Sequence, residues 1–390
     1  MSDATEVIDE TMPIAAVVDR GRPAAAAADV SNGRSRFTRL VFLDVIRAVA
    51  APLVMYDHFV SFWNGYDAPS PVVTGIDTLL RQPLRIEQDF GFFGVALFFL
   101  VSGFVVTHRA TREGAGEFVV KRLLRIYPVL IVVVLFVSIP GVRELVFAGN
   151  LVKQITGFTI LTNMTLANYV LIPQVVLVGV GWTLAIEVMF YVVLILMMPL
   201  LKRWVWAALC VEIAIAWAAI EFARDFGASF FLVAVSLGYL PLLLLGQICW
   251  AVWRQQIPLW SAGVFGTAAW LIYTWNGTRD MGRPDDGYGN TAALALLIFI
   301  LLLIAEPRLR PTRVVSFIAD RSYSIYLLHG VIAFPMMTLL RPILPPVLAI
   351  VCGVAVTMIA VELSFRGIER PAQKLARRLV RRRAPARSPA

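Results

Sequence analysis

The stretch LDVIRAVAAPLVMYDHF, residues 43–59, is the first long apolar run of the chain, and it contains Arg47 and His58. Membrane-spanning helices avoid ionisable side chains, because a charged one costs about 2.5–3.5 kcal/mol at the helix centre. A spacing of about three helical turns places both groups on nearly the same stripe of a helix, about 16 Å apart along its axis. Such a pair predicts a functional site inside a helix bundle. The alternative is a pair of polar residues that only hold helices together.

The composition of the whole chain indicates an integral membrane protein. Of its 390 residues, 59% are hydrophobic and 16% are charged, with a mean hydropathy of +0.75. A soluble domain carries about a quarter charged residues. The net charge of +9 needs no nucleic-acid partner, because membrane proteins concentrate Lys and Arg in their cytoplasmic loops. The histidines form no cluster with metal-ligand spacing, so no metal is expected. Three cysteines in apolar runs are predicted to be buried, unpaired thiols: Cys210, Cys249 and Cys352.

Ten apolar runs are long enough to span a hydrocarbon core of about 30 Å at about 1.5 Å per helical residue. They cover residues 41–63, 89–108, 126–148, 180–201, 204–223, 230–252, 259–276, 290–306, 314–340 and 343–366. The predicted fold class is therefore all-α, a polytopic transmembrane helical bundle of about ten spans. Residues 143–179 leave room for a kinked or re-entrant segment.

The distribution of Lys and Arg predicts that both termini are cytoplasmic. With the N-terminus inside, 26 of the 35 basic residues fall in cytoplasmic segments and 8 in external ones, in line with the positive-inside rule. Three regions follow: a disordered N-terminal tail over 1–40, a membrane domain over 41–370 and a basic tail over 371–390. The basic tail is expected to contact anionic lipid head groups.

Four further segments carry polar or small residues where a simple membrane anchor would have only apolar ones. They are GFFGVALFFLVSGF at 91–104, KRLLRIYP at 121–128, WTLAIEVMFY at 182–191 and SYSIYLLH at 322–329. KRLLRIYP is expected to end a loop and to lead into the third span. WTLAIEVMFY places Glu187 about two turns from the outer surface, and SYSIYLLH, as the start of the ninth span, places His329 about two turns from the inner surface.

In this order, the five segments resemble the acyltransferase-3 family of integral membrane O-acyltransferases over residues 41–370. The matching residues are Arg47 and His58 of its Arg-x10-His signature, then Phe98, Phe99, Ser102, Gly103, Arg122, Arg125, Ile126, Pro128, Trp182, Thr183, Leu184 and Glu187. Ala96 departs from the pattern, because many members have an acidic residue before the two phenylalanines, and this difference bears on the acceptor. The resemblance implies a stand-alone membrane module, since no soluble hydrolase-like domain follows the spans.

The catalytic residue that the resemblance implies is His58, which could take the proton of an acceptor hydroxyl or carry the acyl group itself. Asp57 is a poor partner for it, because sequence neighbours on a helix point about 100° apart. Glu187, at a similar depth on another span, is the expected partner, and the alternative for Glu187 is a packing hydrogen bond. Arg47 completes the predicted catalytic set.

The donor that the resemblance implies is acyl-CoA, whose phosphates suit arginine contacts. The residues expected to bind these phosphates are Lys121, Arg122 and Arg125. The alternative is that they only anchor the helix at the cytoplasmic surface, as the positive-inside rule describes. The secondary site candidates are His329, Tyr326, Ser102 and Trp182. For Ser102, close helix packing is the favoured role. His108 is expected to be solvated beside Arg109, and Glu212 to have a structural role.

These features predict a multi-pass acyltransferase of a bacterial cytoplasmic membrane. It would move a short acyl group, acetyl by default, from acyl-CoA to a hydroxyl of a sugar-containing acceptor: a surface polysaccharide, a glycolipid or a glycosylated metabolite such as a macrolide. Its other partner is membrane lipid, and its oligomeric state is left open. The rival prediction is a transporter or flippase for an anionic solute that uses the same buried Arg47, His58 and Glu187. A regulatory scaffold, the third alternative, leaves these buried charges unexplained.

Overall fold

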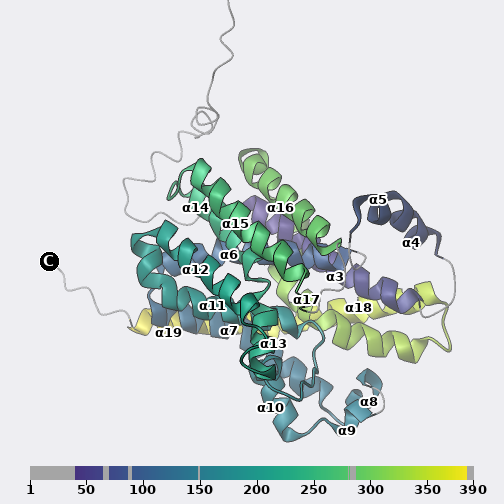
Figure 1. Cartoon of the computed structure of the whole chain (residues 1–390). Helices are drawn as coiled ribbons and strands as arrows, with labels where there is room; N and C mark the ends of the chain where they lie inside the picture. The colour runs from purple at the N-terminus through teal and green to yellow at the C-terminus, as the bar shows by residue number, and fades with distance from the viewer. Residues whose placement is uncertain are drawn as a thin grey trace, which may run out of the picture.

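The computed structural model describes residues 40–64, 70–86, 90–147, 150–279, 281 and 287–383. Every regular element among these residues is a helix, which confirms the predicted all-α class (Figure 1). The predicted N-terminal tail, apart from Leu40, lies outside the described residues, and so do residues 384–390 at the other end of the chain.

Seven helical stretches of the described residues are long and apolar enough to cross a membrane. They are α3 (Val41–Asn64), α6 (Gly91–Arg112), α11 (Gly181–Arg203), α13 (Ala228–Leu237) with α14 (Leu240–Trp253), α16 (Gly287–Ala305), α17 (Arg313–Leu340) and α18 (Pro346–Ser364) with its continuation. Each corresponds to one of the ten predicted spans. The chain is therefore a multi-pass membrane protein, as predicted.

The other three predicted spans correspond to helices that fall short of this measure: α7 (Ala115–Val137), α12 (Val205–Glu221) and α15 (Leu259–Gly277). Helix α12 has 17 residues. Helix α15 contains several glycines and polar aromatic residues, and α7 carries charged side chains in its first three turns. The number of ten spans therefore stays a prediction.

The prediction places the third span too late in the sequence, at 126–148, whereas α7 begins at Ala115 and ends at Val137. KRLLRIYP therefore lies inside this helix and not in a loop. Lys, Arg and Leu are strong helix formers, so the basic cluster continues the helix. Pro128 lies inside this helix, as prolines do in many membrane helices. Tyr323 OH of α17 donates to Ile126 O at 2.6 Å and so ties the two helices together near it.

Short helices fill the region in which a re-entrant segment was considered. They are α8 (Val142–Val146), α9 (Asn150–Lys153), α10 (Gly157–Thr165) and the 3-10 turn η4 (Ala167–Tyr169). The buried side chain of Asn163 fixes the loop that follows. Its amide donates to Val175 O at 2.9 Å, and its carbonyl accepts from Leu177 N at 2.9 Å. The irregular backbone before α11 is thus held by side-chain hydrogen bonds, as buried loops require.

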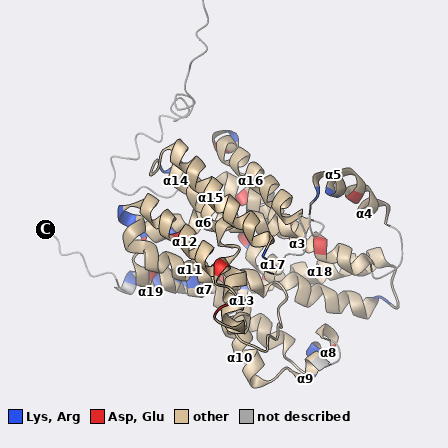
Figure 2. Cartoon of the chain, viewed as in Figure 1, with Lys and Arg blue, Asp and Glu red and all other residues tan. Residues whose placement is uncertain are grey.

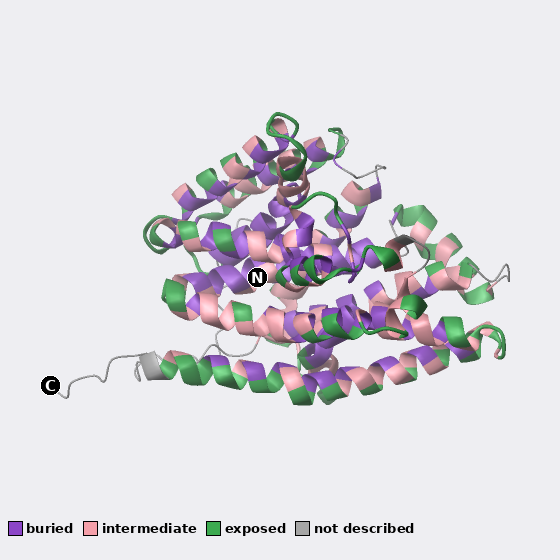
Figure 3. Cartoon of the chain, turned by 90° about the horizontal axis from the view of Figure 1, so that it is seen from below, coloured by how far each residue is buried: buried purple, intermediate pink, exposed green. Residues whose placement is uncertain are grey.

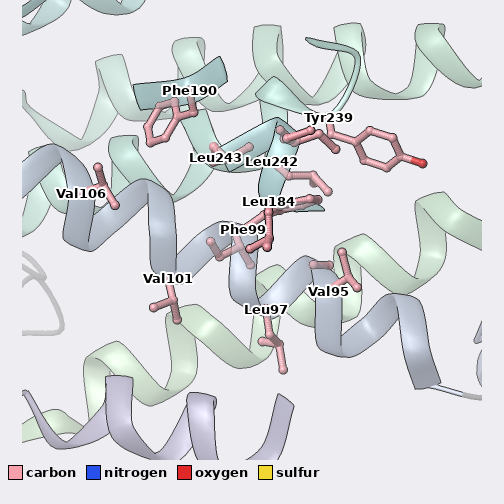
Figure 4. Close-up of a cluster of buried hydrophobic side chains, with 14 of the residues drawn as sticks. Val95, Leu97, Phe99, Val101, Val106, Leu184, Phe190, Tyr239, Leu242 and Leu243 are labelled. Atoms are coloured by element: carbon pink, nitrogen blue, oxygen red, sulfur yellow. The ribbon is translucent and has the colours of Figure 1, made fainter. Parts of the chain in front are cut away.

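Helix α6 lies at the centre of the bundle, where it contacts α3, α11, α14 and α16. Figure 4 shows Phe99 of α6 in one apolar cluster with Leu243 of α14. The two helices approach closely at two glycines. A Cβ on Gly103 would lie 1.9 Å from Leu243 O, and one on Gly246 would lie 2.1 Å from Leu100 O. The small residues of α6 and α14 therefore allow backbone contact between them, as is common in membrane helix packing.

The C-terminal part of the described chain is one long helix. Helix α18 continues through the π-helical turn η6 (Phe365–Glu369) into α19 (Arg370–Arg383), and together they form the long helix along the lower edge of Figure 3. Helix α19 packs against α7. Helical structure therefore extends past residue 370, where the membrane domain was predicted to end. Arg321 of α17 holds the junction, because its guanidinium donates to both carboxylate oxygens of Glu362 and contacts the rings of Phe317 and Phe365.

The surface of the bundle has the charge and aromatic pattern of a membrane protein. Lys and Arg gather around α7, α12 and α19 at one end of the molecule (Figure 2). Exposed tryptophans such as Trp204, Trp206 and Trp260 lie at helix ends, where membrane proteins place their interfacial aromatic residues. The prediction of a buried thiol is wrong for Cys210, which is exposed on α12. An apolar run does not imply burial here, because a membrane helix turns apolar side chains toward lipid.

Candidate active site

Two histidines from distant parts of the sequence, His58 of α3 and His329 of α17, lie side by side. His329 Nε2 is 3.1 Å from His58 Nδ1, and the ring centres are 4.8 Å apart. Each Nδ1 also lies near a carbonyl oxygen one turn earlier: His58 near Val54 O at 2.8 Å and His329 near Ile325 O at 3.1 Å. His329 is completely buried, whereas His58 is half-buried. The helices thus hold both rings in fixed orientations.

These contacts determine which nitrogen of each ring carries the hydrogen. A carbonyl oxygen can only accept, so Nδ1 is the protonated nitrogen of both neutral rings. His329 Nε2 then carries a lone pair and accepts from the Nδ1–H of His58, which His58 shares with Val54 O. The second ring nitrogen of His58, Nε2, therefore carries a lone pair that can take a proton.

His329 lies further along its helix than the expected two turns. Helix α17 begins at Arg313, next to the start of the predicted span 314–340, whereas SYSIYLLH begins nine residues later. His329 therefore lies about 24 Å along the helix from its first residue, at 1.5 Å per residue. This places it beside His58 and makes the pair possible.

A cavity of about 370 Å³ opens between α6, α7, α11, α17 and α19 and ends one side chain short of the histidine pair. Its deep end is formed by Phe98, Thr183 and Tyr326. The hydroxyls of Tyr326 and Thr183 are hydrogen-bonded at 2.8 Å, and the ring of Phe98 meets that of Tyr326 edge-on at 5.6 Å. The other side of Tyr326 faces His329, with ring centres 6.2 Å apart. Tyr326 thus stands between the cavity and the histidines.

Positive charge dominates the wall of this cavity. Two carboxylates, Glu113 and Glu187, line it together with six basic side chains: Arg47, Arg109, Lys121, Arg122, Arg125 and Arg377. Arg109 and Phe98 both lie on α6, so the lining extends about 16 Å along that helix. A concave wall with such an excess of cations attracts an anionic ligand.

The three residues predicted to bind the donor differ in their availability. Lys121 already forms ion pairs with Glu113 at 2.8 Å and Glu117 at 2.5 Å. Arg122 stacks on Phe118 and Tyr191, and its buried Nε atom has no hydrogen-bond partner within the described residues. Arg125 lines the same wall one turn deeper. The two arginines are therefore better placed than the lysine to bind an added anion.

Glu187 bonds to groups other than His58. Its Oε1 atom accepts from Ser102 Oγ at 3.1 Å and from Tyr191 OH at 2.5 Å. The expected position beside His58 is occupied by His329 instead. Ser102 thus hydrogen-bonds Glu187, and the close helix packing expected of it is made by the next residue, Gly103.

Arg47 and Trp182 have separate places. Arg47 lines the cavity, whereas His58, three turns further along α3, lies past its deep end. The two residues of the first motif therefore lie at different points, Arg47 in the cavity wall and His58 past its deep end. The indole of Trp182 packs against Phe99 and Tyr239, with ring centres 6.2 and 5.2 Å apart, and does not line the cavity.

Several lining or bonding residues were not found from the sequence. Tyr191 follows Glu187 by one helical turn, and this spacing was an available signal. Tyr323 lies within SYSIYLLH and donates to the backbone of α7. Gln373 and Arg377 of α19 also line the cavity, and no sequence signal pointed to them, because they follow the last span.

Two other buried polar groups lie away from the cavity. The prediction that His108 is solvated is wrong, because this residue is 1% exposed. Its Nδ1 accepts from Trp250 Nε1 at 3.0 Å. Its position at the end of a span does not expose it, because α14 covers it. Glu212 accepts from Gln247 Nε2 at 2.6 Å, and Gln247 in turn accepts from Thr107, so this network joins α12, α14 and α6. A structural role for Glu212 agrees with these bonds.

Comparisons with known proteins find a matching family model and similar proteins. A family model described as an acyltransferase domain matches residues 40–363, which include both histidines but not α19. Nodulation protein 10 of Rhizobium leguminosarum bv. viciae is 29% identical over 338 residues, which cover 76% of this chain and 83% of that protein. Peptidoglycan O-acetyltransferase OatA of Listeria monocytogenes is 26% identical over 330 residues, which cover 73% of this chain and 51% of that protein. The match thus spans about half of the second relative. No solved structure matches the chain.

Proposed function

The chain belongs to the acyltransferase domain family and is an O-acyltransferase, and we propose that it moves a short acyl group, acetyl by default, from acyl-CoA to a hydroxyl of a sugar-containing acceptor. The observation that carries the proposal is a cavity rich in arginine that ends beside a pair of hydrogen-bonded histidines. The peptidoglycan named in one relative supports a sugar-containing acceptor. Family membership sets aside the rival prediction of an anion transporter.

The positive charge of the cavity and its length along α6 support acyl-CoA as the donor. Its diphosphate is an anion that guanidinium groups bind through paired hydrogen bonds, and Arg122 and Arg125 offer such groups. The pantetheine arm would follow α6 toward Phe98, and the acyl end would meet Tyr326 and Thr183. Movement of the Tyr326 side chain would then admit the thioester to the histidine pair.

The histidine pair supports general-base catalysis. The acceptor oxygen attacks the thioester carbonyl carbon while His58 Nε2 takes the hydroxyl proton. The carbon–sulfur bond then breaks, and the leaving sulfur takes this proton from His58, which leaves an ester, free coenzyme A and a neutral ring. If His58 instead carries the acyl group, the same Nε2 atom attacks the carbonyl carbon first, and the carbon–sulfur bond breaks to release coenzyme A as its thiolate. The acceptor hydroxyl then displaces the neutral ring, and its proton goes to the thiolate, which again leaves an ester and free coenzyme A.

His329 would stabilise the charged form of His58 in this cycle. When Nε2 of His58 is protonated, its Nδ1–H becomes a charge-assisted donor to His329 Nε2. The carboxylate of a Ser-His-Asp triad holds its histidine in the same manner. His329 therefore has a positioning role, with His58 as the residue that contacts the reacting atoms.

The proposed orientation puts both termini and the basic mouth of the cavity on the cytoplasmic side of a bacterial cytoplasmic membrane, where acyl-CoA is present. The gathering of Lys and Arg around α7 and α19 supports it (Figure 2). His58 would then lie about 16 Å deeper than Arg47, nearer the face at which an external sugar could enter.

The test measures both products in one assay. Full-length protein in detergent or native membranes is incubated with acetyl-CoA and, in parallel, with peptidoglycan fragments, cell polysaccharide, glycolipid or a macrolide. Free thiol should appear only with the correct acceptor class, and mass spectrometry should find one added acetyl group on it. Acetylation of such an acceptor that proceeds without any coenzyme A thioester would refute the proposed donor.

A further inference from the structure

Helix α19 reaches the proposed donor cavity although it lies outside the part of the chain that matches the family model. That match ends at residue 363, and α19 begins at Arg370. Nevertheless Gln373 and Arg377 form part of the cavity wall. The donor site of this chain therefore includes side chains that family membership does not account for.

A second cavity, of about 270 Å³, adjoins the first and is lined mainly by side chains of α17, η6 and α19. The two cavities share Arg47, Arg125 and Arg377 as a common wall. Arg370 and Lys374 line only the second one. An elongated anionic ligand that follows the first cavity past Arg125 can therefore continue into the second.

The cations of α19 are arranged to meet one ligand. Arg370, Lys374 and Arg377 follow each other at intervals of four and three residues, so they lie on one face of the helix. Lys374 and Arg377 form no hydrogen bond or ion pair with any other described residue. Two carboxylates, Asp320 and Glu369, line the same cavity and leave it with net positive charge.

The start of α19 is held in place by hydrogen bonds, so the direction of this face is fixed. Glu369 accepts from Ser324 Oγ of α17 at 2.8 Å and from Gln373 Nε2 of α19 at 3.1 Å. Glu369 is 3% exposed, so it acts as a buried connector between the two helices. Packing of α19 on α7 completes the support.

We propose that Lys374 and Arg377 of α19 bind the 3′-phosphate at the nucleotide end of coenzyme A and thereby select acyl-CoA over donors without that group. This inference rests on the proposed function. The diphosphate is assigned to the common wall at Arg125, which leaves the adenosine and its 3′-phosphate for the second cavity. Donors that carry only a phosphopantetheine arm, such as an acyl carrier protein, would leave these cations without a ligand.

The experiment compares two thioesters that differ only in the 3′-phosphate, acetyl-CoA and acetyl-dephospho-CoA. For the full-length protein, kcat/KM should favour acetyl-CoA by about tenfold or more, the effect of charge-assisted hydrogen bonds to one phosphate. The double variant Lys374→Ala/Arg377→Ala should lose this preference through a higher KM for acetyl-CoA. Its KM for acetyl-dephospho-CoA should rise by less than its KM for acetyl-CoA, because that donor lacks the 3′-phosphate.

A matched control lies on the same helix. Arg378 and Arg381 are exposed and line neither cavity, so Arg378→Ala/Arg381→Ala removes the same charge without touching the proposed subsite. This variant should keep the full preference. Adenosine 3′,5′-bisphosphate should inhibit the control more strongly than the Lys374/Arg377 variant, and this difference should be smaller for ADP, which lacks the 3′-phosphate.

Two results would overturn the inference while leaving the proposed function intact: equal use of both thioesters by the unchanged protein, or an unchanged preference in the Lys374/Arg377 variant. A loss of preference in both double variants would also overturn it, because general charge would then explain the effect. Failure to use any coenzyme A thioester is a different outcome, because it refutes the proposed donor itself.

Discussion

The histidine pair gives the sharpest prediction about this protein, because substitutions of its two members should reduce acyl transfer to different extents. His58→Ala and His58→Gln remove the lone pair that takes the proton, so we expect a loss of acyl transfer of about a hundredfold or more. His329→Ala keeps that lone pair and removes only the acceptor that stabilises protonated His58. A hydrogen bond to a charged group contributes about 1.5–3 kcal/mol, which at about 1.4 kcal/mol per factor of ten predicts a 10- to 150-fold loss.

The conservative variant His329→Gln separates positioning from packing. An amide oxygen can accept the Nδ1–H of His58 as His329 Nε2 does at 3.1 Å, so this variant should retain more activity than His329→Ala. The double variant His58→Ala/His329→Ala should be no slower than His58→Ala, because a partner cannot stabilise a charge that no longer forms.

The assay measures ester product per amount of folded protein, with the donor saturating, so that kcat is compared and not abundance. Size-exclusion profiles in detergent give the folded amount for each variant. His58→Gln with substantial turnover at a normal folded amount would refute the catalytic assignment. If the losses of the two single variants, expressed as activation free energies, simply add in the double variant, the two rings are not coupled. That result would refute the positioning role of His329.

Three further predictions concern the donor, the packing and the topology. Arg125→Ala should raise the KM for acyl-CoA about tenfold or more, whereas Lys121→Ala should change it less because carboxylates already pair that lysine; equal effects would contradict the ranking. Gly103→Ala should lower the folded yield, since its Cβ would lie 1.9 Å from a backbone oxygen of α14, at a cost of about 1–3 kcal/mol. Gly263→Ala, which meets nothing within 4 Å, is the matched control, and equal yields would contradict the packing argument. A reporter inserted within 277–289 should read external, and a cytoplasmic reading would refute the proposed orientation.

The composition and the hydropathy pattern were sufficient to predict an all-helical membrane protein. Seven of the ten predicted spans appear as helices of spanning length. The reason is that lipid offers no hydrogen-bond partners, so an apolar run in a membrane pairs its backbone N–H and C=O groups within itself, as a helix does. The start of α7 was missed because charge was read as a sign of a loop. Lys and Arg are equally compatible with a helix whose charged turns line a cavity.

The sequence by itself determined the kinds of residue in the candidate site: Arg47 and His58 on one helix stripe, and an arginine cluster that suits an anion. Only the tertiary structure decided which of these groups meet. His329 lies 271 residues from His58 in sequence, and the two rings bond because α17 packs against α3. Arg377 likewise joins the cavity only because α19 packs on α7. Local sequence sets which face of a helix a side chain occupies, whereas contact between faces depends on how all the helices pack together.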